Sequence, residues 1–488
     1  MKKKNIFLLI LIGLGLRLVL IFLRVHPAGD EIWALYLAQS TLKQIWFATL
    51  SDLHGPFYFL LLHLLRLLTP IPLSIIYLRL VSLFFGIFAC FGTWYLSIQV
   101  AGKKVGLISF ILSLFLPAFI WPAVFARYYS LLIVLVIISM VLFIGFCKTG
   151  KKSSLIWLIV VLTLGIYTHY YFSLLELSFT VYLLLNVHTR KHLIDWISSQ
   201  IIVLLLFTPG LYYLLTLPKP ELIGRHANSI LKIPSLLITN IISSETLIFL
   251  YYFRNPWIYM PILGGLFVVT GILLINVFRY WRSELSKLLI SILIIPPIVL
   301  ILFAYIVQPL FSLGSLQIFI PALVIILAKS IELDLKKTKI FTFAFILCAG
   351  LSLYFLFDTS KIYGGPRKDF TYFYKNYHKG DFVLHSHLGS YLLGSYYSSK
   401  SANFEIIPSG SVTPATAIGV GYKHIMLEEI RSRAPRGVWY FESPYIDKKE
   451  SDQVKSHMES RLTKVHEERF TDANSAISET YFNVYYYQ

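Results

Sequence analysis

The chain has 488 residues, of which 57% are hydrophobic and only 14% are charged, and its mean hydropathy is +0.69. A soluble domain of this size does not have such a composition, so the sequence predicts a polytopic membrane protein. The formal net charge is +18, yet the part before residue 358 holds 27 of the 43 Lys and Arg and only 10 of the 25 Asp and Glu. Basic residues beside apolar segments are typical of cytoplasmic loops and of contacts with anionic membrane lipids, so no nucleic-acid partner is predicted.

The cysteines are few and lie in apolar segments. Cys90, Cys147 and Cys348 are far apart in the sequence, so they predict neither a disulfide framework nor a metal site. We expect them to be core residues, and we expect no metal and no cofactor.

The first apolar segment covers residues 5–24, which is long enough to cross a bilayer as a helix. Lys2, Lys3 and Lys4 precede it, and no cleavage site of small residues follows it. We therefore expect an uncleaved span with a cytoplasmic N-terminus, which places the next loop on the outer side.

That loop carries the chemistry that the sequence singles out. It begins with Gly29-Asp30-Glu31 and ends with Asp52-Leu53-His54-Gly55-Pro56. Two adjacent acids at a membrane boundary are costly unless they are exposed or have partners, which suggests a function. The alternative is that Asp30 caps a helix and that Glu31 is stabilised by the positive helix end.

Short helices are expected within and after this loop, at residues 31–41 and 44–50, lying along the membrane interface. The apolar segment 56–68 is about 20 Å long as a helix, so we expect it to enter the membrane only partially. If the remaining spans alternate in direction, the clusters of Lys and Arg between them all lie on the cytoplasmic side. These spans are residues 73–100, 105–121, 128–147, 154–169, 171–187, 194–217, 257–278, 288–307, 314–328 and 340–357.

The first span and these ten further spans predict an all-α membrane domain over residues 1–357. It has about eleven full transmembrane helices, together with the partial helix and the interfacial helices. Residues 358–488 change in character, because short apolar strands alternate with polar helices. We expect strands at residues 382–385, 404–408, 424–427, 438–442, 464–470 and 482–487, and helices at 369–377, 388–397 and 447–461. The tail is therefore predicted to be a small extracytoplasmic α/β domain.

Several polar groups fall on the same predicted outer side as the acids. Arg79 begins a span, Arg127 and Tyr128 precede another, and Tyr167 and His169 follow a third. Glu176, about two turns after His169, is expected to face the interior of the bundle. Each group alone has an ordinary explanation, since arginines extend to the interface and tyrosines form interfacial belts. Their occurrence together on one side indicates an active face.

An outer face with arginines and carboxylates suits a substrate that has a phosphate head group and a lipid tail. Arginine or lysine stabilises the negative charge of a departing phosphate, and a carboxylate removes the proton from an attacking hydroxyl. Asp30 is the candidate base, and direct displacement would invert the anomeric carbon.

The order of these motifs resembles the GT-C glycosyltransferases of the protein O-mannosyltransferase and aminoarabinose transferase type. The motifs are Gly29-Asp30-Glu31, the Asp52 to Tyr58 segment, Arg79, Ala126-Arg127-Tyr128-Tyr129 and Tyr167-Thr168-His169-Tyr170. The resemblance covers residues 1–190 well and the remainder more loosely. It implies that Asp30, with Glu31 beside it, holds the catalytic base, that Arg79 binds the donor phosphate, and that Asp52 and His54 support the active face.

Two positions depart from the family pattern. Gly55 stands where relatives have a proline, and Gln317-Ile318 stands where many have Arg-Tyr. A late phosphate contact would then come from Lys219, Arg225 or Arg254 of the long outer loop, and the sequence does not choose among them.

The sequence thus predicts a hexosyl- or pentosyltransferase of the bacterial cytoplasmic membrane, with a polyprenyl-phosphate sugar as donor and a lipid, glycan or protein as acceptor. An O-antigen polymerase or ligase is a second possibility, but its key residues are expected in a late loop. A transporter or flippase is a third, but paired half-repeats are not visible.

Overall fold

The computed structural model describes residues 3–24, 27, 29–51, 54–216, 283–306, 317–333, 368–378, 380–385, 391, 394, 396, 403–406, 424–425, 436–442, 448–468 and 483–488. The chain divides into two compact units, and each is composed of three segments. The first unit contains Met1–Leu23, Ile76–Tyr212 and His226–Ser360. The second contains Arg24–Ile75, Tyr213–Arg225 and Lys361–Gln488.

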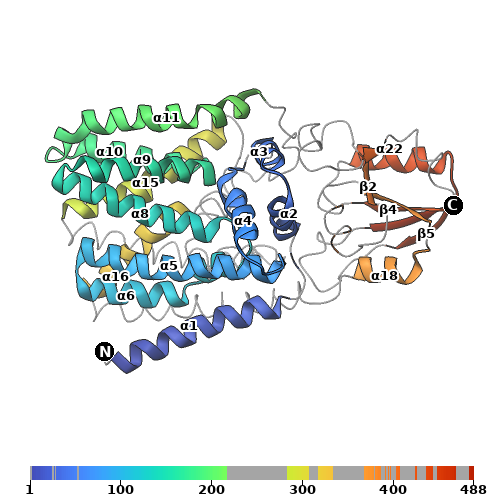
Figure 1. The fold of residues 1–488 in the computed structure, drawn as a ribbon, viewed down its shortest axis with the longest axis horizontal. Coiled ribbons are helices and arrows are strands. Elements are labelled where there is room, and N and C mark those ends of the chain that lie inside the picture. Colours follow the sequence, from blue (N-terminus) through green and yellow to red (C-terminus); the bar gives the residue numbers. More distant parts are fainter. Residues whose placement is uncertain are drawn as a thin grey trace. The chain divides into compact units, whose positions relative to one another are not determined.

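The first unit is a bundle of helices (Figure 1). Its described helices are α1 (Lys3–Leu23), α5 (Ile75–Ala101), α6 (Lys103–Phe115), α7 (Pro117–Val124), α8 (Tyr129–Thr149), α9 (Lys152–Thr168), α10 (Phe172–Leu185), α11 (Leu193–Thr216), α15 (Glu284–Ile306) and α16 (Ile320–Leu333). Exposed leucine, isoleucine and phenylalanine side chains cover α1 and α11, as a lipid-facing surface requires.

Four helices of the described part are long and apolar enough to cross a membrane, and they are Lys4–Leu23, Ile75–Ala101, Tyr129–Thr149 and Arg190–Tyr213. They correspond to four of the predicted spans, and the chain is an integral membrane protein. The expected single span 105–121 is instead two helices that meet at a 52° bend. Pro117 explains the break, because it begins α7 and leaves Leu116 in an extended conformation.

The predicted span 154–169 corresponds to α9, which has 17 residues. The predicted span 171–187 is shorter in the structure, because α10 has 14 residues and is about 21 Å long at 1.5 Å per residue. The predicted span 288–307 coincides largely with α15, whereas 314–328 overlaps only the first part of α16, which continues to Leu333. The predicted spans 257–278 and 340–357 lie outside the described residues.

Successive helices define two ends of the bundle. Helices α8 and α9 pack against each other and reverse direction at Gly150, whose φ of +65° is the left-handed conformation that glycine adopts without strain. Helix α9 ends beside His169, and α10 begins at Phe172. We call residues 125–129 and 168–172 the Arg127 end, and residues 148–152 and 186–193 the Lys148 end.

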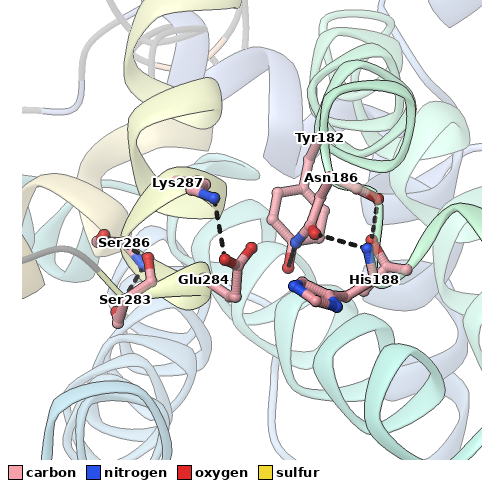
Figure 2. A network of polar contacts seen from close by, with 8 residues as sticks. Tyr182, Asn186, His188, Ser283, Glu284, Ser286 and Lys287 are labelled. Atoms are coloured by element: carbon pink, nitrogen blue, oxygen red, sulfur yellow. Dashed lines mark hydrogen bonds and ion pairs between the residues drawn. The ribbon is translucent and has the colours of Figure 1, made fainter.

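A polar network lies at the Lys148 end (Figure 2). The Asn186 side-chain amide donates to the Tyr182 hydroxyl at 3.0 Å and accepts from the His188 backbone at 3.1 Å. Beside it, Lys287 and Glu284 form an ion pair of 2.9 Å in the first turn of α15. Since α10 packs against α15, this network shows that α15 begins where α10 ends.

The buried arginine Arg17 links α1 to α6. Its guanidinium group donates to the carbonyl oxygens of Gly13, Ser113 and Leu114 at 2.8–3.0 Å. Only 1% of the residue is exposed. Backbone carbonyls thus satisfy a charge that the apolar surroundings would otherwise make costly.

The second unit combines three short helices with the C-terminal sheet. The helices are α2 (Gly29–Gln39), α3 (Leu42–Ser51) and α4 (Phe57–Leu68), close to the predicted ranges. Helix α4 packs against α2, and its Arg66 and His63 bond to the carbonyl oxygens of Gln39 and Ala38 at 3.0 and 3.2 Å. These contacts satisfy carbonyl groups at the end of α2.

The sheet has six strands in the order β3-β2-β1-β4-β6-β5. The strands are β1 (Phe382–His385), β2 (Asn403–Ile406), β3 (His424–Ile425), β4 (Val438–Glu442), β5 (Lys464–Glu468) and β6 (Asn483–Tyr487), with the helices α18 (Lys368–Asn376) and α22 (Lys448–Glu459). Strands β1, β2, β3 and β4 are parallel to one another, and β6 is antiparallel to β4 and β5. The described strands and helices of the tail have the α/β secondary structure that the sequence predicts.

Candidate active site

The Arg127 end gathers polar and aromatic side chains from two turns. Arg127 is 4% exposed, and its guanidinium carbon lies 5.6 Å from the centre of the Tyr128 ring. The Tyr128 ring in turn lies 5.1 Å from the ring of His169. A cation over an aromatic face is favourable, so these contacts orient the arginine. The structure therefore brings together three of the predicted site residues.

Local backbone geometry places Arg127 in this position. Helix α7 ends at Val124, and Phe125 is extended, with φ −113° and ψ 129°. The Arg127 amide then donates to the Phe125 carbonyl at 2.8 Å, a tight turn that leads into α8. Arg127 is thus held in a turn between two helices, and turns of this kind commonly carry binding residues.

His169 occupies the turn between α9 and α10. Its Nδ1 accepts a hydrogen bond from the Tyr171 backbone amide at 3.2 Å. Since Nδ1 is an acceptor, the proton of the neutral ring is on Nε2, which is the donor. Gly165 permits this turn, because a methyl group there would overlap the Phe172 ring.

Arg79 lies in the first part of α5 and is 1% exposed. Its Nη1 donates to the carbonyl oxygen of Ile21, near the end of α1, at 3.2 Å. This bond satisfies a carbonyl that the last turn of α1 leaves without an intrahelical partner. Arg79 therefore connects α5 to α1, and at least one N–H of its guanidinium group is used in this structural hydrogen bond.

Tyr167 and Glu176 differ in their surroundings. The Tyr167 hydroxyl donates to the carbonyl oxygen of Leu206 in α11 at 3.0 Å, and the ring packs against Phe207. This tyrosine joins two helices. Glu176 is 9% exposed in α10, as expected for a carboxyl group that faces the bundle interior, and its Oε1 has no hydrogen-bond partner among the described residues.

The acid pair lies in the second unit, in the first turn of α2. Asp30 is exposed, whereas Glu31 is fully buried. The positive end of the helix favours both carboxylates. An exposed carboxylate can accept a proton from a molecule in solution, and a buried one cannot reach it directly. The structure thus separates two neighbouring acids that the sequence treats as a pair.

His54 is partly exposed, and its backbone amide donates to the Thr49 carbonyl at 2.9 Å. The remaining predicted site residues, Asp52, Lys219 and Arg225, lie outside the described residues. Among the residues that the structure describes, no group of three or more His, Cys, Asp or Glu side chains could hold a metal ion.

The whole fold is similar to solved structures of ArnT from Cupriavidus metallidurans. The apo structure gives a TM-score of 0.57 with 10% identity over 99% of this chain and 98% of that one. The structure bound to undecaprenyl phosphate gives 0.59 with 12% identity over 100% and 98%. An oligosaccharyltransferase of Archaeoglobus fulgidus gives 0.49 with 12% identity over 89% of this chain and 68% of that one. No family model matches the sequence, and no curated protein matches it.

The predicted resemblance to GT-C glycosyltransferases is thus confirmed at the level of the fold. The match extends over the membrane helices and the C-terminal sheet together, because it covers nearly the full length of both chains.

Proposed function

We propose that this chain is an inverting glycosyltransferase that moves a sugar from a polyprenyl-phosphate donor to an acceptor at the outer face of the bacterial cytoplasmic membrane. The observation that carries the proposal is the full-length similarity in fold to ArnT, one structure of which is described as bound to undecaprenyl phosphate. The chain's own residues supply the chemistry that such a reaction needs.

The donor phosphate requires positive charge, because it leaves as an anion. Arg127 is the best candidate in the described part, since its guanidinium group is buried and oriented by the Tyr128 ring. Its planar group can bind two phosphate oxygens at once. His169 can donate a further hydrogen bond from Nε2. Arg79, Lys219 and Arg225 remain proposed phosphate ligands.

The acceptor hydroxyl requires a base as it attacks the anomeric carbon. We assign this role to Asp30, which is exposed at the start of α2. The oxygen–carbon bond forms while the bond from the anomeric carbon to the phosphate oxygen breaks, and the acceptor proton passes to the carboxylate. One displacement of this kind inverts the configuration. Glu31, Asp52, His54 and Glu176 are proposed to support the site.

The test is sugar transfer by the purified protein in detergent, with polyprenyl-phosphate sugars labelled in the sugar. We expect labelled product with the parent protein and none with Asp30→Asn, which removes the base and preserves the side-chain volume. Asp195→Asn is the matched control, because Asp195 is also an exposed acid in the first turn of a helix. Transfer by Asp30→Asn at the parental rate would disprove the assignment of the base.

A further inference from the structure

Gln317 is a buried polar residue of the first unit that differs from most polar residues the structure describes, because its whole amide group is unpaired. It opens a single 3-10 turn at residues 317–319 that leads into α16, and its exposed fraction is 0%. Its Oε1 and its Nε2 both lack a hydrogen-bond partner among the described residues. A buried amide with neither atom paired is destabilising, so a residue of this kind calls for an explanation.

Gln317 belongs to the Arg127 end of the bundle. Helix α15 begins at the Lys148 end, beside the end of α10, and α16 follows it in the chain. Leu323, in the first turn of α16, and Leu327, about one turn further on, cluster with Leu112, which lies in the last turn of α6. The chain continues from that turn through α7 to Arg127. Helix α16 thus starts where α6 ends.

A second buried polar atom occurs at the same end. Ser130, in the first turn of α8, is 0% exposed, and its hydroxyl has no hydrogen-bond partner within the described part of the chain. Ser178 in the middle of α10 bonds to the Leu174 carbonyl four residues earlier, but the residues three and four positions before Ser130 lie in the turn that precedes α8. Unsatisfied polar atoms at the start of both α8 and α16 indicate a polar ligand at this end.

The chemistry of the amide decides what kind of ligand group it fits. Nε2 donates hydrogen bonds and Oε1 accepts them. A phosphate oxygen only accepts, so it would leave Oε1 unpaired. A hydroxyl group both donates and accepts, and two neighbouring hydroxyls satisfy both ends of an amide. A neutral amide also contributes no charge to a phosphate site.

We propose that Gln317 hydrogen-bonds hydroxyl groups of the sugar that is transferred and thereby contributes to the choice of sugar. This inference rests on the proposed function. Gln317 is then a specificity residue for the sugar, and the cations bind the phosphate. The unbound protein keeps an unsatisfied amide, and a bound sugar supplies its partners.

The test compares two kinds of ligand on the purified full chain. Binding of undecaprenyl phosphate and of undecaprenyl-phosphate mannose, glucose and aminoarabinose is measured for the parent and for Gln317→Leu. We expect the variant to bind undecaprenyl phosphate with the parental Kd. For the sugar-bearing compound that the parent prefers, we expect the Kd to rise roughly tenfold, the effect of about one or two lost hydrogen bonds.

Thermal unfolding without ligand gives an independent readout. Leucine replaces the unsatisfied amide with an apolar side chain of similar size. The Tm of the ligand-free variant should therefore equal or exceed that of the parent. Gln317→Met serves the same purpose if leucine does not fit. Ser330→Ala is the matched control, because Ser330 is also buried with an unpartnered hydroxyl among the described residues, toward the other end of α16. It should change neither Kd.

The outcomes separate the two proposals. Equal binding of sugar-bearing donor by parent and variant, or an equal loss for undecaprenyl phosphate and its sugar derivatives, would overturn the role of Gln317 and leave the proposed function standing. A parent protein that binds none of these compounds would overturn the proposed function, and the role of Gln317 with it.

Discussion

Among the residues that the structure describes, three arginines of the first unit are almost fully buried, and they differ in what their guanidinium groups contact. Arg17 donates to backbone carbonyls of α1 and α6, and Arg79 donates to a carbonyl of α1. Arg127 lies over the Tyr128 ring, which is beside His169. The sequence predicts both Arg79 and Arg127 as active-face residues and does not predict a role for Arg17. Residue type and spacing do not show which groups a side chain forms hydrogen bonds with.

At this scale we predict different effects for two substitutions of Arg127. Arg127→Lys keeps the charge but loses the planar group that binds two oxygens, so the Kd for undecaprenyl phosphate should rise roughly tenfold. Arg127→Ala also removes the charge, and the rise should reach roughly a hundredfold. Isothermal titration in detergent measures both values. Arg190→Lys is the control, because Arg190 is exposed at the Lys148 end. Unchanged Kd values for both Arg127 variants would contradict the phosphate role.

The sequence does not predict which of the site residues are buried. The acid pair Asp30 and Glu31 was recognised, but only the fold shows that the first is exposed and the second buried. In the sequence, Gln317 is distinguished only by its departure from the family pattern. Its buried and unpaired amide depends on how α16 packs, which no local pattern encodes.

Secondary structure was predictable where local chemistry decides it. Strands β1 and β4 match the predicted ranges, because each is a short, continuous and fully buried run that is mainly apolar and follows a turn residue. Four predicted spans match described helices that are long enough to cross a membrane, but the prediction misses an interruption. Pro117 divides the predicted span 105–121 into α6 and α7. A hydropathy window averages over such a residue, although proline is a direct signal for a break.

The C-terminal sheet should lose stability in alkaline solution. Burial raises the pKa of Tyr487 above its ordinary value of 10, and the nearby Glu459, Glu467 and Glu442 raise it further. Because the folded pKa is the higher one, the stabilising contribution is complete below pH 10 and is lost as the pH rises from there through the folded pKa. Thermal unfolding and tyrosinate absorbance between about pH 9 and 12 will follow this loss.

A single substitution tests the cause. The Tyr487 hydroxyl has no hydrogen-bond partner among the described residues, so Tyr487→Phe removes the ionisable group without breaking a bond. The variant should keep the parental Tm at neutral pH and should lose stability only at a higher pH. An alkaline transition at the same pH in parent and variant would show that another group controls it.

For the whole molecule, the predicted topology places the N-terminus inside and the Arg127 end outside. Exposed residues at the two ends test it, namely Ser173 near the Arg127 end and Thr149 at the Lys148 end. With the native cysteines replaced by alanine, a membrane-impermeant maleimide applied to intact cells should label Ser173→Cys and leave Thr149→Cys unlabelled. After the cells are opened, both should be labelled. The reverse pattern in intact cells would invert the topology.

The second unit also has a consequence for the order in which the protein is completed during synthesis. Helices α2 to α4 lie between Arg24 and Ile75, while the rest of that unit comes largely from Lys361–Gln488. Tyr36 of α2 interacts with Tyr391, and Phe47 of α3 packs against Tyr213 at 5.2 Å. A ribosome adding roughly 5–20 residues per second makes these partners tens of seconds apart. These two contacts of α2 and α3 can therefore form only after the later segments have been synthesised. We expect a chain that terminates before Tyr391 to lack the first contact and to be more susceptible to quality-control proteases.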